Sequence, residues 1–312
     1  MRLAQYDEVR ALCVEAVRAE GQLRAELLAR RAARGGEQGG RDPSRALPAR
    51  AVSEALARAF PDSVLARLGA TWDVVLSVFA QVLQEQARQS SAALRGAAGA
   101  HVAAFQAGAE LVDLALAEQH SPYLLARSVT ERVVLGPAGG AGAQSAAVRK
   151  REVTRLMRRP EAIADERLRA QVRECVARDP CFSPLFDRAR DVAGDEFEYL
   201  LERELAARGI AFQSEHQLRD QGMAKTPDVK FDVPIGVLGP RGEPRVLFWV
   251  DSKAMFGDPH AHALNRAQLE GYVNRYGPGA VLYWHGFVEE LNSDPTILLL
   301  DRVPALFATP TH

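Results

Sequence analysis

Two strand-forming segments joined by a tight turn constrain the fold of this chain more than any other feature of its sequence. The segments run from Val229 to Leu238 and from Arg245 to Val250, and the loop between them reads Gly-Pro-Arg-Gly-Glu-Pro. Glycine and proline in such a loop are typical of a turn that folds one strand back along the other. A β-hairpin is therefore predicted, and its open end brings the chain back to where the first strand began.

Charged residues stand at the open end of this hairpin. Pro227-Asp228 precedes the first strand, and Asp251-Ser252-Lys253 follows the second. Because side chains alternate across a strand, Asp251 and Lys253 project from one face while Ser252 points away. A turn centred on Gly239-Pro240 places Asp228 opposite Asp251, whereas a longer loop displaces it by several residues. The sequence leaves these two registers open.

Two carboxylates and an ammonium at one place suit hydrolysis of a phosphodiester. Asp228 and Asp251 would form a hard oxygen site for Mg²⁺ or Mn²⁺, which also accept a phosphate oxygen as ligand. The ion would activate a water molecule, and Lys253 would orient that water or offset developing charge. The chain has four lysines against thirty-five arginines, so most of its basic positions carry arginine and the lysine at 253 is an exception. The alternative is a turn dipeptide beside a solvated ion pair.

Two helices are predicted to add polar side chains around the hairpin. The first runs over 194–207 with acidic residues in its first turn, from which Glu198 reaches the metal or its water. The second runs over 262–276, where Gln268 and Tyr272 lie four residues apart on one face and suit phosphate or base contacts. The structural alternatives are charge complementarity at a helix start for Glu198 and packing on the sheet for Gln268 and Tyr272.

The order of these motifs resembles that of the PD-(D/E)xK nuclease superfamily, and the closer resemblance is to the codanin-interacting nuclease family. Four runs carry it: Lys225-Thr226-Pro227-Asp228, then Ser-Lys-Ala-Met-Phe-Gly-Asp at 252–258, Asn-Arg-Tyr-Gly-Pro-Gly at 274–279 and Tyr-Trp-His-Gly-Phe at 283–287. The likeness is strongest from about Ala193 to Leu300. Asp251 departs from the family pattern, which more usually has glutamate there.

The resemblance implies a restriction-endonuclease-like core with a central mixed sheet that holds Mg²⁺ or Mn²⁺. Asp228 and Asp251 would bind the ion, and the backbone carbonyl of Ser252 would add a ligand. Lys253 would serve the attacking water, while Glu198 would support the site and is a candidate ligand. The resemblance also implies a codanin-type protein partner and a distribution between nucleus and cytoplasm.

Other residues of this half are candidates for contact with the substrate. Gln268 would contact substrate or water, Tyr272 would shape the pocket, and Lys225 is a further substrate-binding candidate. His260 and His262 stand two residues apart, so on a helix they diverge and would not share a zinc ion. A loop in which His262 contacts phosphate is the preferred interpretation of that pair.

The first 190 residues are rich in Ala, Leu and Arg, with helical periodicity and almost no strand signal. Thr71 and Ser121 are expected to cap helices, each after a short helix and a break. That arrangement is typical of a helix-turn-helix, and the sequence offers it at two places; in a DNA-reading module the second helix would present Arg127 and Arg132. Helix pairs of an ordinary bundle are the alternative.

The predicted fold class is therefore α+β, with an all-helical domain over 1–190 and a nuclease domain over 191–312. The first carries 28 basic and 22 acidic side chains, +6 net, and the second 11 and 18, or −7. A positive helical part suits phosphates, and an acidic core suits a divalent cation. Glycine-rich stretches near 34–48 and 136–147 are predicted to be surface insertions.

Composition also indicates in which cellular compartment the protein works and which partners it lacks. The three cysteines include no Cys-x-x-Cys pair, which predicts a reducing compartment. No apolar run approaches the roughly 20 residues of a membrane span, so no membrane partner is expected. The leading prediction is a Mg²⁺-dependent nuclease that acts on nucleic acid, DNA rather than RNA. An inactive adaptor of nuclease fold and a transcription regulator are the alternatives, and the second leaves the acidic cluster unexplained.

Overall fold

A computed structural model describes residues 1–33, 55–136, 145–179 and 181–304. The chain divides into two compact units. One contains the described residues of Met1–Arg10, Ser63–Val78 and Arg190–His312, and the other those of Ala11–Asp62 and Phe79–Ala189. We call them the sheet unit and the helical unit. The stretch 34–48 and most of 136–147, predicted to be insertions, lie outside the described residues.

The helices that precede the sheet have the following bounds: α1 (Leu3–Ala33), α3 (Asp62–Leu68), α4 (Trp72–Gln106), α5 (Leu111–Ala117), α6 (Pro122–Leu135), α7 (Ala146–Arg158), the short η2 (Pro160–Ala162), α8 (Glu166–Arg178) and α9 (Pro184–Ala207). Within the described residues, no single helix is long and apolar enough to cross a membrane, and α3 with α4 meets that test only as a pair bent by 87°.

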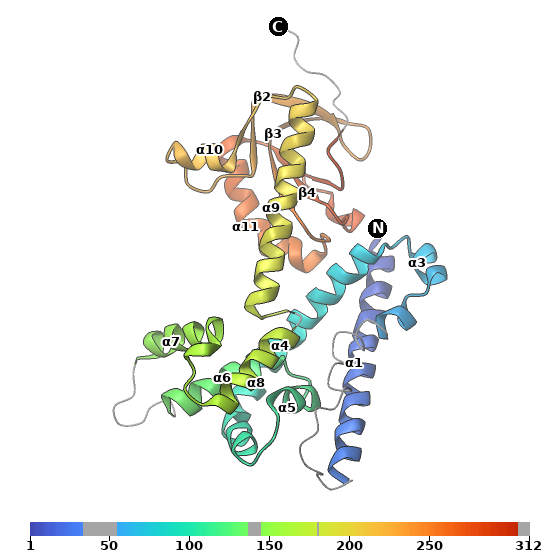
Figure 1. The fold of residues 1–312 in the computed structure, drawn as a ribbon. Coiled ribbons are helices and arrows are strands. Elements are labelled where there is room, and N and C mark those ends of the chain that lie inside the picture. The colour runs from blue at the N-terminus through green and yellow to red at the C-terminus, as the bar shows by residue number, and fades with distance from the viewer. Residues whose placement is uncertain (34–54, 137–144, 180, 305–312) are drawn as a thin grey trace. The chain divides into compact units, whose positions relative to one another are not determined.

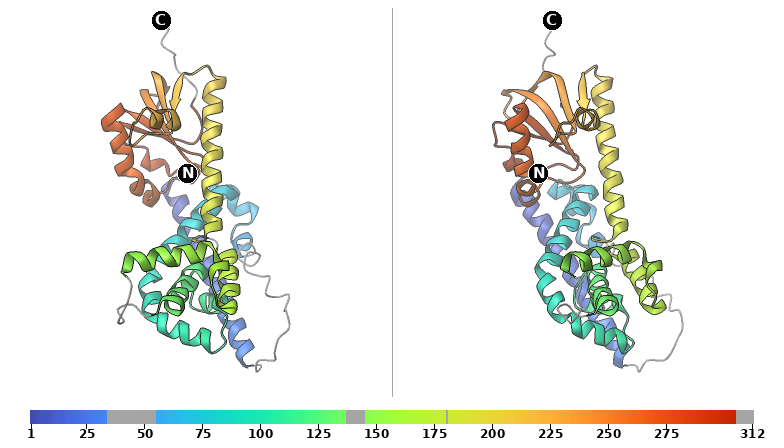
Figure 2. Two further views of the ribbon diagram at one scale, coloured as in Figure 1. Left: turned by 60° about the vertical axis from the view of Figure 1, so that its left-hand side comes forward. Right: turned by 90° about the vertical axis from the view of Figure 1, so that its left-hand side faces the viewer.

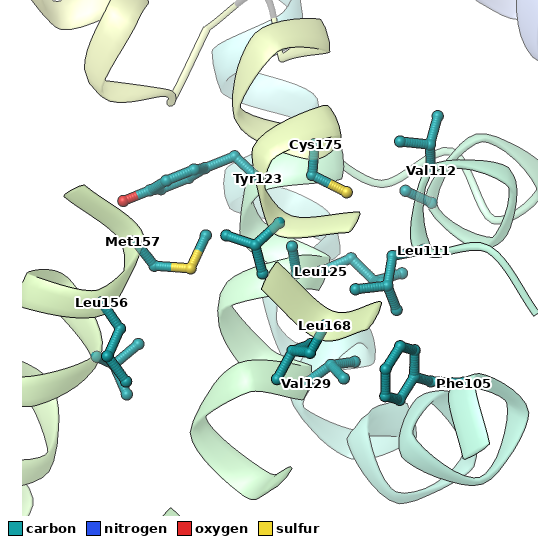
Figure 3. Packing of buried hydrophobic residues seen from close by; sticks show 14 of the residues in the cluster. Phe105, Leu111, Val112, Tyr123, Leu125, Val129, Leu156, Met157, Leu168 and Cys175 are labelled. Carbon is teal, nitrogen blue, oxygen red and sulfur yellow. The ribbon is translucent and has the colours of Figure 1, made fainter. Parts of the chain in front are cut away.

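The helical unit is built around an apolar core from α4 to α8. Figure 3 shows its centre, where Leu125 and Val129 of α6 pack with Leu168 and Cys175 of α8. Ser121 caps α6, as predicted, by accepting a hydrogen bond from the backbone N–H of Leu124 at 3.1 Å. The short-helix, break, capped-helix pattern is thus present, while its use in reading DNA stays a prediction.

The sheet has five strands in the order β1-β2-β3-β4-β5: β1 (Phe212–Ser214), β2 (Val229–Leu238), β3 (Pro244–Lys253), β4 (Gly279–Tyr283) and β5 (Ile297–Leu300). The first three strands are antiparallel, and β3, β4 and β5 are parallel. Helix α10 (Glu215–Asp220) follows β1, α11 (Pro259–Tyr276) connects β3 to β4, and η3 (Glu289–Leu291) precedes β5. The predicted α+β class with a mixed sheet is confirmed.

Helices α9 and α11 cover opposite faces of this sheet (Figures 1 and 2). Leu201 and Leu205 of α9 share a core with Val250 of β3, whereas Leu269 and Tyr272 of α11 share another with the adjacent Trp249. Neighbouring β3 residues enter different cores because side chains alternate across a strand.

The turn before β4 depends on a glycine at 279. A Cβ atom there would lie 2.1 Å from Cε2 of Trp249. The buried indole in turn donates a hydrogen bond from Nε1 to the carbonyl of Gly277 at 2.8 Å. The Gly-Pro-Gly run therefore ends α11 and lets β4 pass close to β3.

The hairpin resolves the register in an unexpected way. Near the turn, Leu238 pairs with Pro244 and Ile235 with Leu247, which is the longer loop of the two alternatives. The register then shifts between Lys230 and Ile235, so that Lys230 pairs with Trp249 and Val229 with Val250. Pro234 lies within this irregularity, as expected for a residue without an N–H. The irregularity compensates the long loop and returns Asp228 to the level of Asp251.

The start of α9 was wrongly predicted. The helix begins at Pro184 and not at Gly194, so the acidic residues Asp195, Glu196 and Glu198 lie in its interior and not in its first turn. Ser183 supplies the true start, because its hydroxyl accepts a hydrogen bond from the backbone N–H of Phe186 at 3.3 Å. Complementarity to the helix dipole therefore does not explain Glu198.

Candidate active site

Two aspartates stand opposite each other where β2 begins and β3 ends. The pairing of Val229 with Val250, continued by one residue, places Asp228 beside Asp251. Oδ2 of Asp228 accepts a hydrogen bond from the backbone N–H of Ser252 at 2.6 Å, which fixes this carboxylate against β3. Asp251 is buried, whereas Asp228 keeps part of its surface accessible.

Lys253 joins the pair from the same strand face. Its Nζ lies 2.6 Å from Oδ2 of Asp251, and the two side chains are 20% and 1% exposed. The two side chains form a short ion pair in a mostly buried place. The convergence of Asp228, Asp251 and Lys253 is the arrangement that the hairpin predicted.

Ser252 points to the opposite face of the sheet, also as predicted. Its hydroxyl accepts a hydrogen bond from Nε1 of Trp284 at 2.9 Å, and the Trp284 ring stacks on Phe197 of α9 with centroids 5.1 Å apart. Phe197 immediately precedes Glu198. This aromatic contact therefore ties the part of α9 that carries Glu198 to the end of β3.

The carboxylates of the site carry more negative charge than Lys253 balances. Burial, and then the charge of Asp251, raise the pKa of Asp228 well above its usual value. Burial also raises the pKa of Asp251, against the lowering effect of Lys253. The pKa of Glu198 is raised by burial and by three nearby acids, Glu215, Asp195 and Asp251. Excess negative charge in a poorly hydrated place favours a bound cation.

Lys253 remains charged in this environment. Burial alone would lower the pKa of its ammonium, but the carboxylates of Asp251, Asp228 and Glu198 outweigh burial and raise it. The side chain is therefore a permanent positive charge and hydrogen-bond donor near neutral pH. It does not act as a proton acceptor there.

A hydrogen-bonded chain links α11 to the residue before Pro227. Gln268 donates from Nε2 to the hydroxyl of Tyr272 at 2.6 Å, and that hydroxyl donates to the carbonyl of Thr226 at 2.9 Å. Tyr272 is buried in the α11 core, while Gln268 is exposed at the surface. Tyr272 thus positions the Thr-Pro-Asp turn, and Gln268 is accessible to a ligand.

The donor set suits Mg²⁺ or Mn²⁺ more than a softer ion. Among the residues that the structure describes, no group of three or more His, Cys, Asp or Glu side chains is arranged to hold a metal. Mg²⁺ needs fewer, since it usually binds through one or two carboxylates and keeps several waters. Asp228 and Asp251 would supply these carboxylates, and hard oxygen donors of this kind fit the ion.

Comparison with known proteins supports a family assignment. A family described as "Protein of unknown function TPD sequence-motif" matches residues 164–303, which include Thr226-Pro227-Asp228. CDAN1-interacting nuclease 1 of Xenopus tropicalis is 39% identical over 202 residues, which are 64% of this chain and 63% of that protein. The Homo sapiens protein of the same name is 36% identical over 65% of this chain and 69% of its own length. The Gallus gallus protein of that name is 32% identical over 76% of this chain and 84% of its own length.

This chain belongs to the CDAN1-interacting nuclease 1 family. The resemblance noted in the sequence is thereby confirmed at the level of the family. No solved structure matches the chain. The aligned part spans somewhat less than two thirds of the Xenopus tropicalis relative.

The other predicted residues of this family member lie outside the carboxylate cluster. Lys225 is exposed, has a left-handed backbone with φ of 55°, and extends over Gly271 of α11. His260 and His262 lie on α11, which begins at Pro259, so they diverge as a helix requires. Nδ1 of His262 lies 3.2 Å from the hydroxyl of Tyr283, an internal contact.

The two arginines predicted to enter a DNA groove belong to α6 in the helical unit. Arg127 donates to Oγ1 of Thr154 at 3.1 Å and to the carbonyl of Lys150 at 3.4 Å, both on α7. Arg132 is exposed. Base contact by either residue stays a prediction, and for Arg127 it would compete with the contact to α7.

Sequence reasoning missed Glu215, which is close to the site in electrostatic terms. It is the first residue of α10, its N–H donates to the carbonyl of Asp228 at 2.9 Å, and its Oε1 accepts from the hydroxyl of Thr226 at 3.2 Å. Its charge helps to raise the pKa values of Glu198 and Asp251. The capping box Ser214-x-x-Gln217 was the signal that would have located it.

Proposed function

We propose that this protein is a Mg²⁺- or Mn²⁺-dependent nuclease of PD-(D/E)xK type, with DNA as the favoured substrate. The single observation that carries the proposal is the convergence of Asp228, Asp251 and Lys253 at the end of β3. The curated relatives bear the name nuclease, which supports the same activity here. We assign hydrolysis to residues 191–312 and nucleic-acid or partner binding to 1–190.

Each residue of the site has a chemical task in this proposal. Asp228, Asp251 and the carbonyl of Ser252 would hold the ion, which when bound polarises the phosphodiester and activates water. Lys253, kept protonated by its carboxylate neighbours, donates to oxygens on which negative charge develops. Glu198 supports the site from α9, and Gln268 contacts the substrate beside it.

The antiparallel β1-β2-β3 segment followed by a parallel crossover through α11 supports a restriction-endonuclease-like core. The charged residues lie at the carboxyl end of β3, where parallel sheets commonly bind ligands. We also propose a codanin-type protein as partner, because the relatives are named for interaction with CDAN1. We further propose a distribution between nucleus and cytoplasm, which the resemblance to the family implies.

The test is a cleavage assay with a matched aspartate control. Purified protein is incubated with single-stranded, duplex and branched DNA and with RNA, in Mg²⁺, in Mn²⁺ or in chelator. We expect metal-dependent cutting that Asp228→Asn abolishes. Asp232→Asn is the control, since Asp232 is exposed on the same strand and contacts Gln213 at 3.0 Å, outside the site.

The outcome also separates the enzyme from an adaptor of the same fold. Equal cutting by wild type and Asp228→Asn would assign the activity to a contaminant and remove the nuclease proposal. Binding of nucleic acid or of a codanin-type protein without any metal-dependent cutting would favour the adaptor.

A further inference from the structure

The outer side of α7 in the helical unit carries an unusual density of positive charge. Residues 146–159, which are α7 and its C-cap, contain six basic side chains and one acidic one. Five of the six are exposed, and together they form what we call the α7 basic face: Lys150, Arg151, Arg155, Arg158 and Arg159.

The opposite side of α7 explains why this face is turned outward. Val153, Leu156 and Met157 are buried in the core of the helical unit, where Figure 3 shows the last two. The sixth basic residue, Arg149, is buried too and donates to Glu131 at 3.1 Å and to the carbonyl of Leu135 at 2.9 Å. Apolar and polar anchors thus fix which side of the helix faces solvent.

A neighbouring helix braces α7 from the side. Arg127 of α6 donates to the hydroxyl of Thr154 and to the carbonyl of Lys150. The Thr154 hydroxyl in turn donates to the same carbonyl at 2.7 Å. The guanidinium that the sequence suggested for a DNA groove is therefore used to hold α7 in place, and the free charges stand on α7 itself.

The charges of this face are largely unbalanced and line a common hollow. The one acid of the segment, Glu152, pairs with Arg155 at 2.6 Å. Within the described part of the chain, the other four basic side chains form no ion pair. The face surrounds a surface hollow of about 600 Å³ that is also lined by Ala147 and Thr154. Unpaired, clustered ammonium and guanidinium groups are suited to an extended polyanion.

We propose that the α7 basic face binds the phosphodiester backbone of nucleic acid. This inference rests on the proposed action on nucleic acid, and it identifies the surface of the helical unit that contacts the substrate. Lys150 and Arg158 are eight residues apart on the helix, which corresponds to about 12 Å at roughly 1.5 Å per residue. One strand of duplex DNA offers a phosphate about every 3.4 Å along its axis. The face is therefore long enough to contact more than one phosphate of a strand, without reading base sequence.

Binding is tested by fluorescence anisotropy of labelled duplex DNA with the full chain in chelator, where cleavage does not contribute. The variant is Arg151→Gln/Arg158→Gln. The matched control is Arg95→Gln/Arg173→Gln, two exposed arginines of α4 and α8 in the same unit. Each lost phosphate contact reduces affinity about eightfold at roughly 0.1 M salt and lowers the slope of log K against log salt by about 0.9.

We expect the α7 variant to bind about 60-fold more weakly, with a slope reduced by about 1.8, and the control to change less than about threefold. Single-stranded DNA and RNA arms show which polymer the face prefers, and loss in any of them supports the backbone contact. An α7 variant that binds all three polymers like the control overturns the proposal. Polyglutamate serves as a non-nucleic polyanion. An α7 variant that loses binding to polyglutamate but to none of the nucleic acids also overturns the proposal, because that result would assign the face to an acidic protein.

The closing comparison separates this inference from the nuclease itself. If the α7 face binds DNA but the protein never cuts it, the nuclease proposal fails and the face stands. If wild type cuts while the α7 variant binds like the control, the face is wrong and the nuclease stands.

Discussion

Replacement of Lys253 by methionine probes the charge balance of the site in the metal-free protein. Methionine keeps most of the apolar stem and removes only the ammonium that lies 2.6 Å from Asp251. Breaking a buried ion pair by removal of one partner costs about 3–5 kcal/mol, because the other charge is left uncompensated. Lys253 is 20% exposed, so we expect the lower end, a loss of about 3 kcal/mol in the free energy of unfolding.

Urea unfolding at pH 7.5 in chelator measures this loss. With a slope of about 2 kcal/mol per M, the midpoint should fall by roughly 1.5 M. Adding Asp251→Asn to Lys253→Met removes the orphaned charge and should restore about 2 kcal/mol. Lys230→Met is the control, since Lys230 lies on β2 and forms no ion pair among the described residues, and it should shift the midpoint little.

Two results would refute this reasoning. One is a Lys253→Met midpoint equal to that of wild type, which would mean that Asp251 does not depend on the ammonium. The other is a double variant no more stable than Lys253→Met, which would place the lost stability in packing and not in charge.

Three further predictions concern the same unit. The pKa of Asp228 is raised in the fold, so ionisation of this carboxyl destabilises the metal-free protein. The stability advantage of Asp228→Asn over wild type should therefore grow from about pH 4 upward. Thermal melts that show the same difference at every pH would contradict this. Tyr272→Phe removes the hydrogen bond to the carbonyl of Thr226 and should lower the free energy of unfolding in urea by about 1–2 kcal/mol. An unchanged free energy of unfolding would show that this hydrogen bond does not stabilise the fold. Gly279→Ala places a Cβ 2.1 Å from the Trp249 ring and should cost at least about 2 kcal/mol, and a neutral result would disprove the close approach.

The pattern of the hairpin was enough to predict that its two strands exist and that its charges are grouped, although β3 runs to Lys253, three residues beyond the predicted end. Val229–Leu238 was predicted with the bounds that the structure shows, because its ends are marked by Pro227-Asp228 and by Gly239-Pro240. Its register was not predictable. The length of the loop by itself would place Asp228 several residues away from Asp251. The register shift around Pro234 brings the two residues back to the same level, and the sequence pattern does not show that shift.

Helix starts show a different limit. Gly194 was taken as a boundary because glycine and the acids after it imitate a first turn, whereas the capping signal at Ser183-Pro184 lies ten residues earlier. Glu215 was missed because α10 is only six residues long and shows little periodicity. Short elements of this kind are found from their caps and not from their hydrophobic pattern.

The helical unit shows why charge type alone does not identify a binding surface. Arg127 and Arg132 were preferred because the helix-turn-helix pattern placed them on a second helix. In the structure Arg127 is committed to α7, and the exposed charge lies on α7 itself. Which arginines face solvent depends on the apolar side of each helix, and that side is fixed by the core.

Manganese binding followed by electron paramagnetic resonance tests the central claim most directly, because it needs neither substrate nor turnover. Wild type should bind Mn²⁺ and lose affinity as pH falls, since the carboxylates must be deprotonated to bind. Asp228→Asn and Asp251→Asn should each weaken binding at least about tenfold, while Asp232→Asn should leave it unchanged. Equal Mn²⁺ affinity in Asp228→Asn and wild type would contradict a metal site between β2 and β3.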